Sequence, residues 1–456
     1  MDTLTVQIGD DHSDLRSEGD LNLSDARLRW QAEHLDRDTR TLLDEDAAVF
    51  LHQSLSTPCL NALESCEGPH IVDTQGRRIF DFHGNSLHQV GHANPKVIEA
   101  IQRQLAELAF CPRRYTNRPA IDLAKKLVEK APGDLSRVLF APGGTSAIGM
   151  ALKLARAATG RYKTISMWDS FHGASLDAIS IGGEAIFRKG IGPLMPGTEH
   201  VPPPDPASCP FKCGTVCTLQ CADYIEYVLE KEGDVAAVIS ETVRSTPYIP
   251  PPDYWKRVRA ACDRHGALLI LDEIPTCLGR TGTFYTHEHY GIVPDMVVIG
   301  KGLGGGVFPL AALLAREHLN SAMPERALGH YTHEKNPVAC AAALATIAFI
   351  EENDLLEHVT ELGTYTLERL RGLQEEFPCI GDVRGLGLLL GVAIVEPGTA
   401  KPAPAHAEKI LYAALSRGLS FKVSMGNVLT LAPALTITRE QMDEALGILA
   451  QSLSST

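Results

Sequence analysis

Two short apolar runs of the chain each lead into a residue that could take part in catalysis. Residues 267–271 are followed by Asp272, and residues 296–300 are followed by Lys301 and then by a glycine-rich segment. Unbroken apolar runs of this length predict strands that are buried on both faces of a parallel sheet. Ligands of open α/β sheets bind at the carboxyl ends of such strands, so we expect the two side chains to meet at a binding site.

Lys301 and Asp272 suit one kind of cofactor chemistry. An amine that is buried among apolar residues loses part of the stabilisation of its charge and becomes a nucleophile that can form a Schiff base. A carboxylate on a neighbouring strand would keep a pyridine nitrogen protonated, as pyridoxal 5′-phosphate requires in order to accept electrons. We therefore predict a pyridoxal 5′-phosphate site, with a structural ion pair between the two residues as the alternative interpretation.

A third segment predicts where the phosphate group would bind. Residues 138–156 have the pattern of a strand, a glycine turn and a helix, with Gly143, Gly144 and Thr145 at the turn. The first turn of a helix carries free backbone amides that bind phosphate, and a threonine adds a hydroxyl group.

These segments, together with residues 272–282 and 331–337, resemble the class III (ω-)aminotransferase family, and the resemblance extends from about Gly68 to about Ile448. It implies the α/β fold of pyridoxal-phosphate transferases of fold type I. In that fold a large domain has a mostly parallel seven-stranded sheet flanked by helices, and a smaller α+β domain accompanies it.

The resemblance also implies a division of the chain into three parts. We expect an N-terminal helical segment that joins the small domain (residues 1–70), then the large cofactor-binding domain (71–325). A connecting helix and the C-terminal small domain (326–456) complete the chain.

The resemblance assigns roles to individual residues. It implies that Lys301 carries the cofactor and removes the substrate's proton, that Asp272 pairs with the ring nitrogen, and that Phe171 stacks on the ring. The residues expected to bind the cofactor are Gly143, Gly144, Thr145, Phe171, His172, Glu241, Asp272, Lys301 and Thr332. Because the threonine of the Thr332 segment reaches the cofactor of the other subunit in this family, we expect a homodimer with shared active sites.

Among the positions that depart from the pattern of the family, three bear on binding of the cofactor or of an α-carboxylate. Ser146 replaces the usual glutamate after the phosphate turn, and Pro275 replaces a glutamine that contacts the ring hydroxyl of the cofactor. Thr430 occupies the position at which relatives that act on α-carboxylates have an arginine. The changes at Pro275 and Thr430 weaken the interpretation of the chain as a transaminase of amino acids.

Several cationic side chains indicate an anionic substrate, and the resemblance implies that it is a small amine, an aminophosphonate. Guanidinium groups bind phosphate or phosphonate bidentately, and histidine can donate a proton near neutrality. Arg244 stands where the family usually has a glutamine. We expect His83, Arg113, Arg114 and Arg244 to contact the substrate, with a structural histidine and a solvated arginine loop as the alternatives.

Residues 83–91 and 272–275 most resemble a branch of the family that breaks down phosphonates, the ammonia-lyases of (R)-1-hydroxy-2-aminoethylphosphonate. We therefore expect conversion of that compound to phosphonoacetaldehyde and ammonia. One alternative is an ω-aminotransferase that acts on 2-aminoethylphosphonate or another primary amine with pyruvate. A non-catalytic pyridoxal-phosphate-binding regulator is a remote alternative, because no basic helix-turn-helix stretch precedes the domain.

The composition sets outer limits on these interpretations. The chain has 456 residues, of which 44% are hydrophobic, so it can bury a large core. Its net charge of −14, without a long basic run, makes nucleic acids and acidic membranes poor partners. Neither a long apolar run nor a signal-peptide pattern is present, so we expect a cytoplasmic protein.

Four of the eleven cysteines recur at intervals of four residues: Cys209, Cys213, Cys217 and Cys221. This spacing would align them on one face of a helix, but Pro206, Pro210 and Gly214 predict a loop. Zinc sites usually contain more closely spaced cysteine pairs. We therefore expect a surface insertion with free thiols and no metal, and metal binding is the less favoured alternative.

Overall fold

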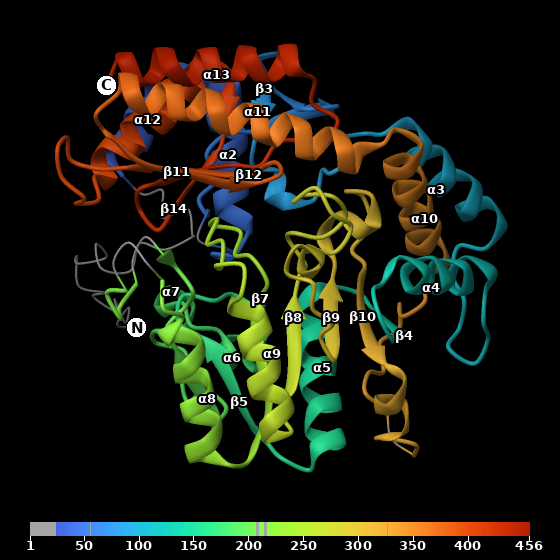
Figure 1. The fold of residues 1–456 in the computed structure, drawn as a ribbon. Coiled ribbons are helices and arrows are strands. Elements are labelled where there is room, and N and C mark those ends of the chain that lie inside the picture. The colour runs from blue at the N-terminus through green and yellow to red at the C-terminus, as the bar shows by residue number, and fades with distance from the viewer. Residues whose placement is uncertain (1–23, 55, 207–208, 214–216, 326) are drawn as a thin grey trace, which may run out of the picture.

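The computed structural model describes residues 24–54, 56–206, 209–213, 217–325 and 327–456. Residues 1–23 of the predicted N-terminal helical segment (1–70) therefore lie outside the described residues. Three sheets and the helices around them make up the described part of the chain (Figure 1).

The largest sheet has seven strands in the order β4-β10-β9-β8-β7-β5-β6. Strand β10 is antiparallel to both of its neighbours, and the other four strand pairs are parallel. This arrangement confirms the predicted mostly parallel sheet of seven strands. The strands are β4 (Leu135–Ala141), β5 (Lys163–Met167), β6 (Thr198–Val201), β7 (Val235–Glu241), β8 (Leu268–Asp272), β9 (Met296–Ile299) and β10 (Ala311–Arg316).

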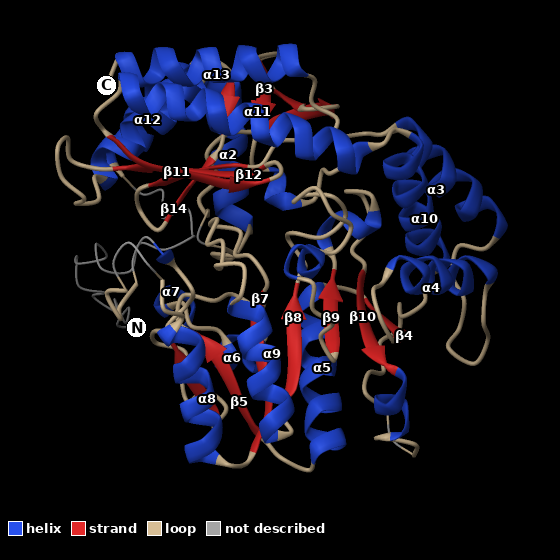
Figure 2. Cartoon of the chain, viewed as in Figure 1, coloured by secondary structure: helices blue, strands red, loops and turns tan. Residues whose placement is uncertain are grey.

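Successive side chains of the central strands point to two different cores. Ile270 of β8 packs in the cluster that includes the helix behind the sheet, whereas Leu269 and Leu271 pack in the cluster on the opposite face. Both faces are thus covered by helices, which explains the unbroken apolar runs (Figure 2). The covering helices are α5 (Gly144–Thr159) on one face, and α8 (Gln220–Glu232) and α9 (Tyr254–His265) on the other.

An antiparallel sheet in the C-terminal part has the strand order β11-β12-β15-β14. The outer helices in this region are α11, α12 and α13 (Figure 1). The bounds of these elements are β11 (Ile380–Leu386), β12 (Leu389–Ile394), β14 (Lys422–Ser424), β15 (Val428–Leu431), α11 (Leu355–Glu376), α12 (Pro404–Ser416) and α13 (Arg439–Ser454).

The third sheet joins the N-terminal and C-terminal parts of the chain. Its strands are β1 (Leu63–Glu67), β2 (His70–Asp73), β3 (Arg78–Asp81) and β13 (Leu419–Ser420), with β13 parallel to β3. The predicted hairpin is confirmed by the antiparallel pairing of β2 with β3. The predicted domain boundary between residues 70 and 71 falls within this sheet, after β1 and inside β2. The division into domains stays a prediction.

The N-terminal helices lie against the C-terminal part. Helix α1 (Asp25–His34) packs on α12 through Trp30, which shares a small core with Tyr412 and Leu415. Helix α2 (Arg37–Val49) follows. The remaining α-helices are α3 (Pro95–Glu107), α4 (Arg118–Lys130), α6 (Leu176–Ile181), α7 (Ala185–Arg188) and the predicted connecting helix α10 (Pro337–Glu352). Within the described residues, no helix is both long and apolar enough to cross a lipid bilayer.

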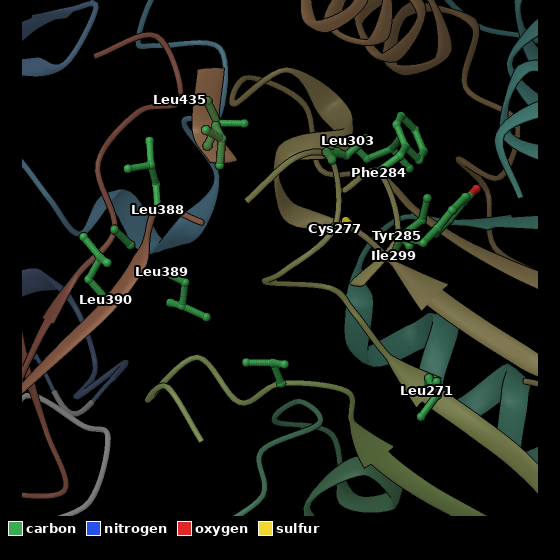
Figure 3. Close-up of a cluster of buried hydrophobic side chains, with 14 of the residues drawn as sticks. Leu271, Cys277, Phe284, Tyr285, Ile299, Leu303, Leu388, Leu389, Leu390 and Leu435 are labelled. Carbon is green, nitrogen blue, oxygen red and sulfur yellow. The ribbon is translucent and has the colours of Figure 1, made fainter. Parts of the chain in front are cut away.

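One apolar cluster joins the large sheet to the C-terminal sheet. Leu271 and Ile299, from β8 and β9, belong to the same cluster as Leu388, Leu390 and Leu435 (Figure 3). Because protein interiors are close-packed, this cluster fixes the ends of β8 and β9 relative to β12 and β15. The cavity between these elements therefore has walls from two distant parts of the chain.

Candidate active site

A cavity of about 410 Å³ lies at the carboxyl ends of β7, β8 and β9. The strands contribute Glu241 and Asp272, and Lys301 follows β9 directly. The wall from the N-terminal region is Phe82, His83, Asn85 and Ser86, and the wall from the C-terminal sheet is Lys422, Thr430 and Ala432. The other lining residues are Gly144, Thr145, Phe171, His172, Gly173, Phe187, Ser245, Ile274 and Pro275.

Asp272 is held in a fixed orientation by two hydrogen bonds. Its Oδ2 lies 2.7 Å from His172 Nδ1, and its Oδ1 accepts from the backbone N–H of Ile274 at 3.0 Å. Both Asp272 and His172 are buried. Because the carboxylate accepts, Nδ1 of His172 carries the hydrogen. A buried, oriented carboxylate of this kind can keep a nearby heterocyclic nitrogen protonated.

Lys301 stands in a strained turn. Its φ of 49° lies in the left-handed region, which costs a non-glycine residue about 1–3 kcal/mol. Gly302 follows it, and a Cβ there would lie 1.9 Å from Gln89 Oε1, so a larger residue would have to displace the buried Gln89 side chain. The expectation of a buried amine is wrong for the single chain, because Lys301 is exposed where it lines the open cavity.

The predicted phosphate turn lies at the start of α5. Gly144 is the first residue of the helix, and Thr145 follows it in the cavity wall. The Thr145 hydroxyl lies 2.7 Å from Ser175 Oγ, and it also accepts from the backbone N–H of Ser175. A Cβ at Gly144 would lie 2.7 Å from Ile274 Cδ1, so a side chain here would have to push the end of Ile274 aside. Gly143 caps the helix immediately before.

The loop that carries His83 is fixed by a buried carboxylate. Asp81 Oδ1 accepts from the backbone N–H groups of His83 and Gly84, at 3.0 and 2.8 Å. Its Oδ2 accepts from His92 Nε2 at 2.9 Å, and its backbone carbonyl accepts from His88 Nε2 at 3.0 Å. His88 therefore supports the loop from behind, while His83 faces the cavity.

Asn85 and Ser86 are cavity residues that the sequence did not identify. They form a short 3-10 turn with Gly84 and have φ values of 47° and 57°. Strained backbone of this kind is concentrated at binding sites. The available signal was the Gly-Asn pair at positions 84–85, since both residue types tolerate the left-handed region.

Phe171 lies in the cavity wall as the sequence predicted. Its ring lies 4.6 Å from that of Phe187, which also lines the cavity and was not predicted. The two rings form an apolar wall next to Asp272 and His172, and this wall is suited to cover one face of a planar ligand.

Arg244 lies outside the lining of this cavity. It forms a buried ion pair with Glu184, lies 3.8 Å from Glu241, and stacks over the ring of Tyr248. It lines an adjoining cavity of about 20 Å³, to which Glu241 also contributes. Its predicted contact with the substrate stays a prediction.

Three other predicted residues also lie away from the cavity of the single chain. Arg113 and Arg114 are exposed between α3 and α4, and Thr332 is exposed between β10 and α10. The predicted role of Thr332 depends on a second subunit, because the resemblance implies that its hydroxyl reaches the partner's cofactor. The predicted contacts of Arg113 and Arg114 with the substrate stay a prediction.

Among the cavity residues, Lys422 bears most directly on the charge of the ligand. It lies on β14 opposite Thr430 of β15, and both residues line the cavity. Lys422 and Lys301 are the two lysines among the described residues that line it. The positive charge of Lys422 is therefore paired across β14 and β15 with Thr430, the position at which carboxylate-binding relatives have an arginine.

The residues of the cavity fit pyridoxal 5′-phosphate. Asp272 provides a carboxylate for the ring nitrogen, and Phe171 provides a flat apolar surface. The first turn of α5, with Thr145, provides donors for a phosphate, and Lys301 provides an amine for the aldehyde. Glu241 and His172 complete the set that the sequence predicted on this side of the cavity.

Comparison with known proteins places this geometry in context. The family described as Aminotransferase class-III matches residues 53–453. The chain is 48% identical to the (R)-1-hydroxy-2-aminoethylphosphonate ammonia-lyase of Vibrio splendidus (strain 12B01), over 96% of this chain and 95% of that protein. It is 38% identical to the leucine/methionine racemase of Thermococcus litoralis, over 91% and 95% of the two chains.

A solved structure of a transaminase has the same fold as this chain. The (S)-enantioselective omega-transaminase of Thermomicrobium roseum superposes with a TM-score of 0.84 and 30% sequence identity. The match covers 91% of this chain and 98% of that one.

Protonation of His88 should weaken the folded state in acid. Burial lowers the pKa of His88 to about 4, whereas the unfolded chain takes up that proton near pH 6.5. This contribution to stability is complete above pH 6.5 and is lost as the pH falls towards 4, a loss of roughly 3 kcal/mol. Asp81, His92 and Arg280 are the charged or titratable groups around the ring.

The measurement is the free energy of unfolding of wild type and His88→Gln between pH 7 and pH 4.5. We expect a shallower decline in the variant, and an unchanged slope in His52→Gln, which replaces an exposed histidine. Parallel slopes for wild type and His88→Gln would contradict the prediction.

Proposed function

Because the chain belongs to the class III aminotransferase family, we propose that it is an ammonia-lyase converting (R)-1-hydroxy-2-aminoethylphosphonate to phosphonoacetaldehyde and ammonia. The identity of 48% to the Vibrio enzyme supports this assignment. The structural observation that carries it is the pair Lys422 and Thr430 in the cavity wall. An α-carboxylate anchor is absent at Thr430, and a cation that suits a phosphonate stands opposite.

Pyridoxal 5′-phosphate, when bound, supplies an electron-accepting ring that stabilises negative charge on the carbon next to the substrate's nitrogen. Asp272, oriented by His172 and the Ile274 amide, holds a proton on the ring nitrogen. The amides at the start of α5 and the Thr145 hydroxyl bind the phosphate. Phe171 excludes water from one face of the ring.

Lys301 acts as the base of the reaction. Its Nζ takes the proton from the carbon that carries the amine. The hydroxyl on the neighbouring, phosphonate-bearing carbon leaves as water after it receives a proton, and both Lys301 Nζ and His83 are cavity groups that can donate one. Hydrolysis of the released enamine yields phosphonoacetaldehyde and ammonia, so the atoms of the substrate are conserved without a keto acid.

Lys422 binds the phosphonate. It approaches from β14, on the wall opposite the strand ends that carry Asp272 and Glu241. A phosphonate carries up to two negative charges, and hydrogen bonds to charged groups are stronger than neutral ones. The Thr430 hydroxyl donates to Ser424 Oγ at 3.0 Å, so the residue paired with Lys422 is small and uncharged where carboxylate-binding relatives have an arginine.

A homodimer accounts for the remaining predicted residues. Leu105, Leu108, Phe110 and Tyr115 are large apolar side chains exposed on and after α3, next to Arg113 and Arg114. Exposed apolar groups that gather on one segment favour a contact with another subunit. We assign this segment and Thr332 to a subunit interface, where they complete the partner's cavity.

The decisive test of the reaction is incubation with (R)-1-hydroxy-2-aminoethylphosphonate in the absence of any keto acid. We expect continuous release of ammonia and phosphonoacetaldehyde, followed by a coupled dehydrogenase assay. 2-Aminoethylphosphonate, which lacks the leaving hydroxyl, should release no ammonia. Turnover that requires pyruvate, with either substrate, would identify an ω-aminotransferase instead.

Replacement of the carboxylate should separate cofactor binding from catalysis. Asp272→Asn should keep pyridoxal 5′-phosphate bound, but we expect kcat to fall by several orders of magnitude because a neutral amide no longer stabilises the protonated ring nitrogen. Absorbance spectra report binding, and ammonia release reports turnover. Near-normal kcat in Asp272→Asn would remove this residue from its assigned role.

Replacement of the phosphonate anchor should affect the aminophosphonate specifically. Lys422→Gln should lower kcat/KM by roughly 10- to 100-fold, as expected when one charge-assisted hydrogen bond is lost. Lys422→Arg should retain more activity, and Lys409→Gln, which replaces an exposed lysine of α12, should retain all of it.

Arg244→Gln provides the comparison for that experiment. Because Arg244 already pairs with Glu184, we expect its replacement to lower stability more than kcat/KM. A larger loss of kcat/KM in Arg244→Gln than in Lys422→Gln would make Arg244 the anchor.

A further inference from the structure

A second cavity, of about 240 Å³, lies between β6 and the start of α8 and has no lining residue in common with the first. It is lined by all four regularly spaced cysteines: Cys209, Cys213, Cys217 and Cys221. The predicted loop is confirmed for residues 209–213 and 217–219, and Cys221 lies in the first turn of α8. The thiols of a segment of thirteen residues thus face one space.

The first two of these cysteines already lie at the separation of two ligands of one ion. Cys209 Sγ and Cys213 Sγ are 3.6 Å apart. Zinc binds thiolate sulphur at about 2.3 Å in a tetrahedron, which places two ligand sulphur atoms about 3.8 Å from each other. The hydroxyl of Thr218 donates to Cys213 Sγ at 3.5 Å.

The chemistry of the side chains decides which ion fits this cavity, because its four cysteines supply sulphur ligands. Soft thiolate ligands select zinc over the hard cations Mg²⁺ and Ca²⁺.

We propose that Cys209, Cys213, Cys217 and Cys221 bind one structural Zn²⁺ ion. Among the described residues, no three of these sulphur atoms lie within 4.8 Å of one another. Binding therefore draws Cys217, which is exposed, and Cys221 inward towards the first pair. The cavity gives them the space to do so, and four thiolates satisfy the ion completely, which is the pattern of a structural site and not of a catalytic one.

The position of the cavity indicates what such an ion would stabilise. Pro203 and Pro204 line this cavity and also the small cavity that contains Arg244 and Glu241. Fixing the cysteine loop therefore supports the wall behind Glu241. We expect loss of zinc to lower the thermal stability of the protein more than its activity at low temperature.

Metal content of the full-length protein, purified without chelator or affinity metal, tests the proposal directly. We expect one zinc ion per chain by plasma mass spectrometry. The double variant Cys209→Ser, Cys213→Ser should contain none, and Cys66→Ser, which removes an exposed thiol of β1, should keep its zinc. Zinc at the same level in the double variant, or no zinc in wild type, would overturn the proposal.

If the cysteine variants do not fold, exchange of the metal in the wild-type protein tests the proposal instead. Wild-type protein treated with a chelator and then with Co²⁺ should develop the absorption bands of a tetrahedral tetrathiolate site, and zinc added back should restore the unfolding temperature. Absence of both effects would overturn the proposal. A disulfide between Cys209 and Cys213 in metal-free protein from a reducing cytosol would also overturn it, in favour of a redox pair.

Discussion

The buried carboxylate of Asp272 is the constraint on which the rest of the site depends. Taking a carboxylate out of water costs several kcal/mol unless hydrogen bonds satisfy its oxygens. Here one oxygen faces His172, which follows β5, and the other accepts from the backbone after β8. The loops that follow two separate strands must therefore meet at this point, which requires β5, β7 and β8 to keep their order in the sheet.

The register of the sheet then fixes where the other reactive groups lie. Glu241 is the register partner of Asp272, and Asp272 in turn is the partner of Val298 on β9. Lys301 follows Val298 by three residues, beyond the hydrogen-bonded ladder, where a left-handed turn is sterically possible. The energetic cost of that turn is offset by the burial of the strand before it, since every residue of β9 is buried.

The sequence allowed the prediction of elements whose signal is local. Apolar runs predicted β8 and β9, the glycine turn predicted the start of α5, and a strand-turn-strand pattern predicted β2 and β3. Contacts that join distant segments were not predictable. Arg244 carries a charge that indicated an anion, but Glu184, sixty residues earlier, neutralises it in the fold. Lys422 lies on a strand of three residues, too short for a recognisable pattern, and only the pairing with β15 brings it to the cavity.

Thr430 stands where carboxylate-binding relatives have an arginine, and Lys422 supplies a positive charge opposite it. This difference bears on how the anionic group of the ligand is bound. An arginine presents a planar fork that matches the planar oxygens of a carboxylate, whereas lysine is a compact point charge with three donors. A guanidinium fork also binds phosphonate oxygens bidentately, whereas the ammonium group of a lysine can serve any oxygen of a tetrahedral phosphonate without a fixed orientation. Under the proposed function, the wall formed by β14 and β15 selects a phosphonate by the position of its charge, because Lys422 offers a cation and Thr430 lacks the anchor for an α-carboxylate. An arginine introduced at position 430 would return to this wall the anchor that carboxylate-binding relatives use, and should therefore raise the ratio of kcat/KM for an α-carboxylate substrate to kcat/KM for the aminophosphonate.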